Sequence, residues 1–349
     1  MLSSKMKLYH HNNAMLIMIV VLFTSMIATI PDKTVPFTYP NGWPKPVYDF
    51  AKNPRTVVGF QLGKDLFFDP ILSDDNTISC GSCHLSFTAF THADHRLSHG
   101  IKGRIGTRNT STLINLAWNT SFMWDGGVNN IEVQAINPIT NPLEMDSDLG
   151  ELIDKLQNSS DYPKRFYEVY NDSVIDSKKL LKALAQFTVS LTSFESKYDS
   201  VSRGESGIKF TQKEANGYEL FKTHCATCHE EPLFTNNSFK NNGLAVDTFL
   251  NDSGRMGITK NSEDAFKFRV PTLRNIEHSA PYFHDGRVNR LKDVLKHYTS
   301  EIQHSSTLAP ELKDKINLTR KQQIEIVAFL KTLTDKQFLY NMNYRQTNN

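Results

Sequence analysis

The stretch Cys80-Gly81-Ser82-Cys83-His84 decides how the rest of this chain is organised. In a C-x-x-C-H motif, two thiols at this spacing can form thioethers to one porphyrin, and the adjacent histidine can bind its iron. A second copy, CATCH at residues 225–229, uses the other two of the four cysteines. A dithiol redox site or a zinc site would need further cysteines or suitably spaced ligands, which the sequence does not offer. The sequence therefore predicts two covalently attached c-type haems, held by Cys80, Cys83 and His84, and by Cys225, Cys228 and His229.

Length and composition are those of a soluble globular protein. With 349 residues, 39% of them hydrophobic and 22% charged, the chain can form two domains with sizeable cores. The formal net charge of +2 equals the contribution of Lys5 and Lys7, because the first thirty residues contain no acidic side chain. The remainder is neutral overall, so nothing in its charge predicts a nucleic-acid partner.

Residues 1–30 have the pattern of an export signal. A weakly basic start precedes an apolar run over residues 14–30, with Ala28 at a plausible cleavage position. The run is also near the lower limit for a membrane span, so an uncleaved anchor is the alternative to the preferred cleaved signal. Covalent haem attachment needs reduced thiols at an extracytoplasmic site. Both interpretations therefore predict export, with the periplasm as the destination.

Hydrophobic periodicity predicts a mostly α-helical protein. Apolar residues at helical spacing precede the first haem motif over residues 57–68, and further helices are expected over 111–118, 131–136 and the whole of 148–198. Capping-box patterns at Thr211 and Thr319 predict helices entering the second motif and near the chain end. We expect two cytochrome c-like domains, each binding one haem. The expected division is 1–30 (signal or anchor), 31–200, 201–340, and a polar tail, 341–349.

Motifs beyond the haem sites indicate a family. They are LGKDLFFDP (62–70), RNT (108–110), FMWDGG (122–127), NPLEM (141–145), VPTLRN (270–275) and PYFHDG (281–286). In order and spacing they resemble the bacterial dihaem cytochrome c peroxidases, a family that includes the methylamine-utilisation protein MauG. The resemblance covers roughly residues 45–335. It implies reduction of hydrogen peroxide at the N-terminal haem, with the C-terminal haem relaying electrons or storing oxidising equivalents.

The resemblance also addresses the open face of the first haem. Many family members carry a removable histidine ligand at the position of Ile101, whose side chain cannot bind iron. His92, His95 and His99 lie in the same loop; solvated loop histidines are the preferred interpretation and a substitute ligand is the alternative. An open pocket of this kind resembles the MauG branch.

Three residues are implied to line that open face: Gln134, Pro138 and Glu144. A carboxylate with a pKa raised by burial can take a proton from the iron-bound peroxide oxygen and return it to the departing oxygen, while an amide orients the peroxide. Trp124 is implied to lie between the two haems. There it can be both a packed aromatic side chain and a stepping stone for electrons.

The sixth ligand of the second haem distinguishes the branches of the family. The resemblance places Tyr298 there, as in the MauG branch, whereas many peroxidases use methionine. Methionine raises the reduction potential and phenolate lowers it. Met256 and His297 remain alternatives. His284 is expected to form a hydrogen bond near a haem propionate.

A calcium ion is implied between the domains, bound by the Asn109 side chain and by the main-chain carbonyls of Ser279 and Pro281. The leading hypothesis for the whole chain is a periplasmic peroxidase that takes electrons from a small c-type cytochrome or cupredoxin. The alternative is MauG-like, peroxide-dependent oxidation of a protein or small-molecule substrate. A dihaem electron carrier without turnover is the third hypothesis, and it leaves Gln134 and Glu144 without a role.

Overall fold

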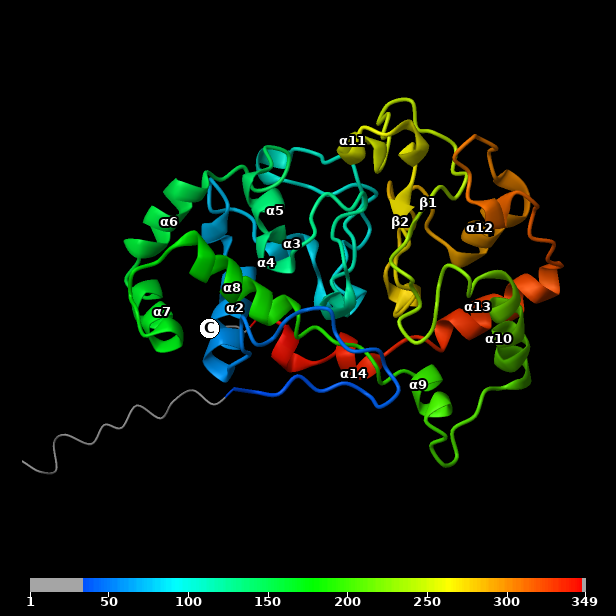
Figure 1. Cartoon of the computed structure of the whole chain (residues 1–349), viewed down its shortest axis with the longest axis horizontal. Helices are drawn as coiled ribbons and strands as arrows, with labels where there is room; N and C mark the ends of the chain where they lie inside the picture. The colour runs from blue at the N-terminus through cyan, green and yellow to red at the C-terminus, as the bar shows by residue number, and fades with distance from the viewer. Residues whose placement is uncertain (1–33, 347–349) are drawn as a thin grey trace, which may run out of the picture.

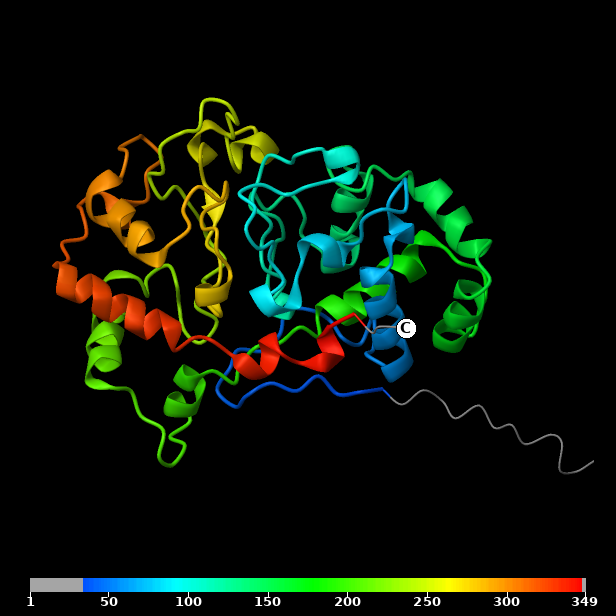
Figure 2. The ribbon, with the colours of Figure 1, turned by 180° about the vertical axis from the view of Figure 1, so that it is seen from behind.

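A computed structural model describes residues 34–346 of the chain, and the predicted signal or anchor lies outside that range. Two helical lobes stand side by side (Figures 1 and 2). Within residues 34–346, no helix is long and apolar enough to cross a membrane. The only sheet in this part of the chain pairs β1 (Phe239–Lys240) with β2 (Phe268–Arg269) in antiparallel fashion. The predicted mostly-α fold is confirmed.

The helices follow the order of the chain. The first lobe contains α2 (Val57–Phe68), α3 (Cys80–Cys83), α4 (Ile131–Gln134), α5 (Ile136–Thr140), α6 (Leu149–Gln157), α7 (Tyr162–Tyr170) and α8 (Ser177–Thr188). The second lobe contains α9 (Lys197–Ser202), α10 (Gln212–His224), α11 (Met256–Thr259), α12 (Leu291–Lys296) and α13 (Arg320–Lys331). The last helix, α14 (Lys336–Leu339), runs back beneath the first lobe (Figure 2).

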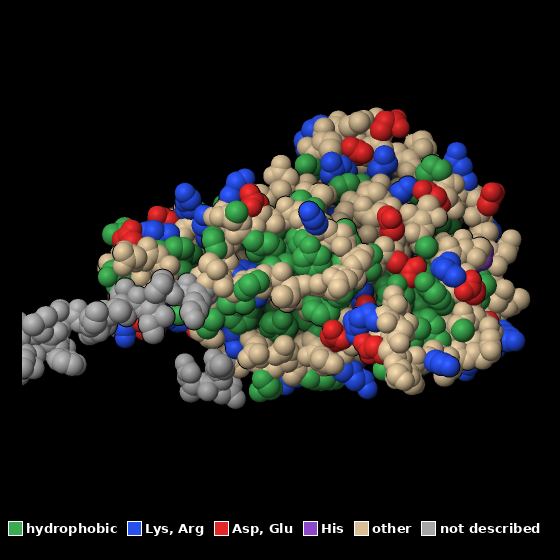
Figure 3. All heavy atoms as spheres, turned by 60° about the horizontal axis from the view of Figure 1, so that its bottom comes forward, with side chains coloured by type: hydrophobic (Ala, Val, Ile, Leu, Met, Phe, Trp, Pro, Cys, Tyr) green, Lys and Arg blue, Asp and Glu red, His purple; other side chains and the backbone are tan. Residues whose placement is uncertain are grey.

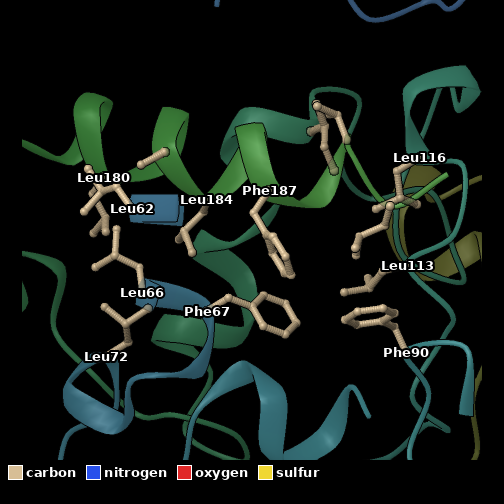
Figure 4. Packing of buried hydrophobic residues seen from close by; sticks show 14 of the residues in the cluster. Leu62, Leu66, Phe67, Leu72, Phe90, Leu113, Leu116, Leu180, Leu184 and Phe187 are labelled. Atoms are coloured by element: carbon tan, nitrogen blue, oxygen red, sulfur yellow. The ribbon is translucent and has the colours of Figure 1, made fainter. Parts of the chain in front are cut away.

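In the first lobe, α2 packs across α8 and forms the core behind the first haem motif. Leu62, Leu66 and Phe67 of α2 face Leu184 and Phe187 of α8 (Figure 4). All five side chains are buried, and burying each of them contributes on the order of 1.5–3 kcal/mol. The helix that leads towards the haem motif is therefore fixed by apolar packing.

The second lobe repeats this helix crossing. In α2, a Cβ added at Gly63 would lie 1.9 Å from the Ala183 carbonyl oxygen of α8. In α10, a Cβ added at Gly217 would lie 1.9 Å from the Glu325 carbonyl oxygen of α13. Each lobe thus brings its haem-motif helix against a later helix at a glycine, because only glycine permits this backbone approach.

A second repeated unit lies, in sequence, between the two crossing helices of each lobe. Residues 122–128 and 282–288 both begin and end in an isolated antiparallel bridge, Phe122 with Val128 and Tyr282 with Val288. Both have positive φ at their second residue, 67° and 69°, and at their fifth, a glycine, 72° and 64°. The two lobes are therefore built on one plan, which the cysteine spacing alone did not reveal.

The N-terminal segment covers the lower face of the molecule. Figure 3 shows hydrophobic side chains gathered across the middle of this face. Rings of Phe37, Tyr39 and Trp43 lie 5.5, 5.8 and 5.2 Å from the Trp118 ring, and Trp118 Nε1 donates to the Pro44 carbonyl at 2.7 Å. Residues 34–56 are thus an extended strap that is packed by aromatic contacts.

Several local predictions need correction. The helix expected over 111–118 is only a 3-10 turn at Leu116–Trp118, because Asn115 adopts a left-handed conformation with φ 56°. The region 148–198 is not wholly helical: it is interrupted between α6 and α7, between α7 and α8, and after Thr188, where an irregular segment is held by the Asn115 side chain through Ser193. Both predicted capping boxes are confirmed at the starts of α10 and α13.

The hydrophobic clusters divide the chain slightly differently from the predicted boundary at residue 200. Tyr198 packs in the second cluster, whereas Phe338 and Leu339 pack in the first. Tyr344, in the predicted polar tail, packs 5.4 Å from the Phe338 ring and donates to the Ser190 carbonyl at 3.1 Å. The C-terminal segment therefore returns to the first lobe.

Candidate active site

Both motif histidines are oriented by main-chain carbonyls. Nδ1 of His84 lies 2.6 Å from the Phe90 carbonyl oxygen, and Nδ1 of His229 lies 3.2 and 3.1 Å from the carbonyl oxygens of Phe234 and Pro271. A hydrogen bond from Nδ1 leaves Nε2 available to a metal. Burial lowers the pKa of each ring to about 4, so both remain in the neutral form that binds iron. The two histidine rings therefore share the same hydrogen bonding at Nδ1 and the same neutral form.

The second lobe, together with part of the first, lines a cavity of about 510 Å³ that contains the second motif. Cys225, Cys228 and His229 line it together with apolar side chains that include Val270, Leu295 and Leu330. A c-type haem is a flat, mostly apolar group that is attached through two cysteine thiols and bound by one histidine. The cavity offers all three of these side chains in an apolar lining. The residues present therefore fit a c-type haem.

Tyr298 lines the same cavity. Burial raises the pKa of its hydroxyl to about 12, and the nearby Cys225 and Cys228 thiols act in the same direction. His297 instead directs Nε2 to the Asn242 carbonyl at 2.9 Å. Neither His297 nor Met256, at the start of α11, is among the described residues that line the cavity.

The repeated units give Tyr298 a counterpart in the first lobe. Tyr298 lies ten residues after Val288, and Pro138 lies ten residues after Val128. Pro138 is in α5, and its carbonyl accepts from the Met145 amide at 3.1 Å. A side chain that can bind metal in the second lobe thus corresponds to one that cannot in the first.

Glu144 lies beside the first haem motif. Its side chain is close enough to Cys80 and Cys83 that its charge raises the pKa of both thiols, after the larger effect of their burial. Burial raises the pKa of Glu144 itself, while a 3.0 Å hydrogen bond from Asn141 Nδ2 acts against this. The Ile101 amide donates to the Glu144 carbonyl at 2.8 Å, and the Ile101 side chain is buried. The structure thus brings Ile101 and Glu144 together.

Gln134 ends α4 and directs its amide towards Met123, with Nε2 3.6 Å from the sulfur. Met123 directly precedes Trp124 in the repeated unit. Trp124 Nε1 donates to the Asn109 carbonyl at 2.8 Å, and the Trp124 carbonyl accepts from the Arg269 amide at 2.7 Å. Because Trp124 also lines the cavity of the second lobe, it lies at the boundary between the lobes.

Comparison with known proteins agrees with this arrangement. The profile of the di-haem cytochrome c peroxidase family matches residues 58–207, and that of cytochrome c matches residues 214–334. The MauG protein of Methylophilus methylotrophus is 31% identical over 339 residues, covering 93% of this chain and 96% of that protein. The cytochrome c551 peroxidase of Nitrosomonas europaea is 36% identical over 296 residues, covering 82% and 83%.

The chain belongs to the dihaem cytochrome c peroxidase family. It also resembles the crystal structure of a MauG-like protein associated with microbial copper homeostasis, with 29% identity, a TM-score of 0.80, and coverage of 89% of this chain and 99% of that one. The predicted family, its two c-type haem domains and its activity as a peroxide-using oxidoreductase are confirmed. The individual residue roles remain predictions.

This peroxidase has three histidines packed together after its first motif. The His95 ring lies 4.3 Å from the His92 ring and 4.4 Å from the His99 ring. Burial, followed by the two neighbouring rings, lowers the pKa of His92 to about 4. Within residues 34–346, no group of three or more His, Cys, Asp or Glu side chains is arranged to hold a metal ion. The cluster is partly buried rather than fully solvated.

The residues implied in calcium binding also come together in the peroxidase. Asn109, Ser279 and Pro281 all line the cavity of the second lobe. The Asn109 side-chain nitrogen donates to the carbonyls of His95 and Arg96 at 3.3 and 3.1 Å, which leaves its side-chain oxygen for another partner. Two segments distant in sequence thus contribute to the lining of one cavity.

Sequence analysis missed the ion pairs that join the lobes. Arg108 donates to both carboxylate oxygens of Asp252, at 2.6 and 2.8 Å, and also pairs with Asp125. Arg96 pairs with Asp247 and Asp285. The Arg108 position was visible in the RNT motif, but its partner is 144 residues away, so no local pattern could identify it.

Proposed function

We propose that this protein reduces hydrogen peroxide to water in its first lobe, with electrons that enter through the second. The observation that carries the proposal is the partly buried Glu144 carboxyl beside the first haem motif. When bound, the first haem would supply a redox-active iron that passes the electrons received from the second lobe to the peroxide. Reduction of one peroxide to two waters consumes two electrons and two protons.

Glu144 is assigned the proton transfers. Ionised, it accepts the proton of the oxygen that binds the metal; protonated, it donates to the departing oxygen. Burial raises its pKa, which moves the carboxyl towards the pH at which both forms are accessible, and the hydrogen bond from Asn141 fixes its position. The Gln134 amide is assigned the role of orienting the bound peroxide.

We assign to Trp124 the role of carrying electrons between the lobes. Its indole is held by Asn109 of the first lobe and its carbonyl by Arg269 of the second, so the ring keeps one position between the two sites. A small c-type cytochrome or cupredoxin is the proposed electron donor. The predicted export signal supports the proposal that the reaction takes place in the periplasm, which fractionation of cells producing the full chain would test.

A second candidate function is favoured by Tyr298. Its position in the cavity with His229 supports a phenolate as the sixth ligand, a hard anionic donor that stabilises the oxidised iron. Such a site suits peroxide-dependent oxidation of a protein or small molecule, as the MauG relatives suggest. In EPR and visible spectra of the ferric protein, we expect one high-spin signal and one low-spin histidine–tyrosine signal. A methionine–iron charge-transfer band would contradict Tyr298.

We also propose one calcium ion, bound by the Asn109 side-chain oxygen and the carbonyls of Ser279 and Pro281. Hard oxygen donors of this kind suit Ca²⁺. Chelation followed by metal analysis tests this: one calcium per chain should be lost, and electron transfer between the lobes should slow. Protein that retains its activity without calcium would contradict a role for the ion.

The peroxidase assay mixes the holoprotein with H2O2 and a reduced small c-type cytochrome. We expect rapid oxidation of the cytochrome that depends on peroxide. Peroxide consumption without cytochrome oxidation would favour the second candidate function. Haems that do not respond to peroxide at all would contradict both functions and leave only electron transfer.

A further inference from the structure

Arg269 is a buried arginine that has no carboxylate partner among residues 34–346. It lies in β2, on the side of the second lobe that faces the first (Figure 1), and its residue is 7% exposed. Its Nη1 lies 3.4 Å from Asn237 Oδ1, a weak contact, and its Nε is buried without any hydrogen-bond partner. Within residues 34–346, no carboxylate forms a salt bridge with it.

Two other arginines in the interior each have a carboxylate partner. Arg274 is held by both carboxylate oxygens of Asp199 at 2.9 and 2.8 Å, and Arg108 is held in the same way by Asp252. Leaving a charge in the interior without a counter-ion costs several kcal/mol. Burial alone lowers the pKa of Arg269 to about 10, and no neighbouring carboxylate opposes this. Among residues 34–346, no side chain supplies the counter-ion that this buried guanidinium calls for.

The cavity that Arg269 lines is the one that contains Cys225, Cys228 and His229. A c-type haem carries two propionate carboxylates on the edge opposite its thioether bonds. Figures 1 and 2 show α10, which leads into the thiols, on the outer side of the lobe, and β2 on the inner side. A haem attached at the thiols would therefore carry its propionates towards β2.

We propose that Arg269 binds a propionate of the second haem through a two-point ion pair. Thr110, from the first lobe, lines the same cavity, and its buried hydroxyl also has no hydrogen-bond partner. We assign to it a second hydrogen bond to the propionates. The planar guanidinium suits a carboxylate, and a charge-assisted bond is stronger than a neutral one. The inference rests on the proposed function only in that this cavity holds the electron-relay haem; it does not depend on Tyr298.

This assignment makes Arg269 a positioning residue for electron transfer. Its main-chain amide donates to the Trp124 carbonyl at 2.7 Å, so one residue holds both the propionate edge and the Trp124 segment. Its positive charge also favours the reduced iron, because reduction adds negative charge nearby. Removing the charge should therefore make the second haem harder to reduce.

The test is spectroelectrochemical titration of the R269Q holoprotein, with haem content measured first. We expect the equilibrium constant for reduction of the low-spin haem to fall at least tenfold, which is 59 mV for a one-electron couple. R269K should recover most of the loss. The matched control is R255Q, because Arg255 lies at the same interface but already contacts the Asp125 carbonyl and Asp264. An unchanged potential in R269Q, or an equal shift in R255Q, would overturn the proposal.

If R269Q does not retain its second haem, R269K carries the test. Lysine keeps the positive charge but cannot form the two-point contact of a guanidinium. The reduction potential of the second haem should therefore stay near the wild-type value, while the propionate bending band in resonance Raman spectra should shift. A wild-type band would refute the ion pair. The outcome is also separable from that of the proposed function. If the wild type consumes no peroxide but R269Q is still harder to reduce, the peroxidase proposal fails and this one stands.

Discussion

Breaking the buried ion pair between Asp199 and Arg274 should destabilise the second lobe strongly. Arg274 is 1% exposed and also donates to the Pro232 carbonyl at 3.0 and 2.7 Å, while its guanidinium lies 4.6 Å from the Trp43 ring. It therefore ties α9, the segment after the second haem motif and the N-terminal strap to one point. D199N keeps the shape of the side chain but leaves the arginine charge without its partner.

The expected loss in the free energy of unfolding is about 3–5 kcal/mol, as found when one partner of a buried pair is removed. That is a large part of the roughly 5–15 kcal/mol that stabilises a typical protein. The double variant D199L/R274M removes both charges, so it should recover much of the loss. The assay is urea unfolding of the holoprotein, followed by circular dichroism and by absorbance of the second haem.

The matched control is E195Q, which breaks the exposed pair between Glu195 and Arg203 and should cost less than about 1 kcal/mol. A loss in D199N no larger than that of the control would refute the assigned role of the pair. So would a double variant that is less stable than D199N, because the cost would then come from lost packing and not from the unpaired charge.

Three further outcomes are expected. G217A should lower the free energy of unfolding by about 1–3 kcal/mol, because the new methyl group meets the Glu325 carbonyl of α13. An unchanged midpoint of urea unfolding would contradict the close packing of α10 against α13. Burial lowers the pKa of His284, which stacks 3.7 Å from Phe268, to about 4 from about 6.5 when unfolded. Its stabilising contribution, up to about 3 kcal/mol, is therefore complete above pH 6.5 and is lost as the pH falls towards 4, and H284F should make the pH dependence of unfolding shallower. W124F should slow electron transfer between the haems in stopped-flow measurements while leaving both haem spectra unchanged; an unchanged rate would remove Trp124 from the route.

The sequence predicted those parts of the protein that local chemistry determines. The two haem motifs, the helix over residues 57–68 and the capping boxes at Thr211 and Thr319 each depend on neighbours within a few positions. The failed helix over 111–118 shows the limit. Its periodicity was helical, but the left-handed conformation of Asn115 and its bonds to Ser193 are tertiary effects.

The candidate site was only partly accessible to sequence reasoning. The family motifs indicated Gln134 and Glu144, but not that Glu144 would be partly buried beside the thiols of Cys80 and Cys83. Arg269 was passed over because an arginine between apolar residues is ordinary in sequence. Its significance comes from a missing carboxylate, which only the three-dimensional arrangement reveals.

The central claim is that Glu144 transfers the protons of peroxide reduction, and the E144Q variant tests it most directly. Stopped-flow mixing of the holoprotein with H2O2 should give a peroxide reaction about 10²–10⁴-fold slower than in the wild type, because glutamine cannot accept or donate the proton. Haem content should be unchanged, and E151Q, at an exposed carboxylate of α6, should react normally. An E144Q protein that consumes peroxide at the wild-type rate would contradict the account.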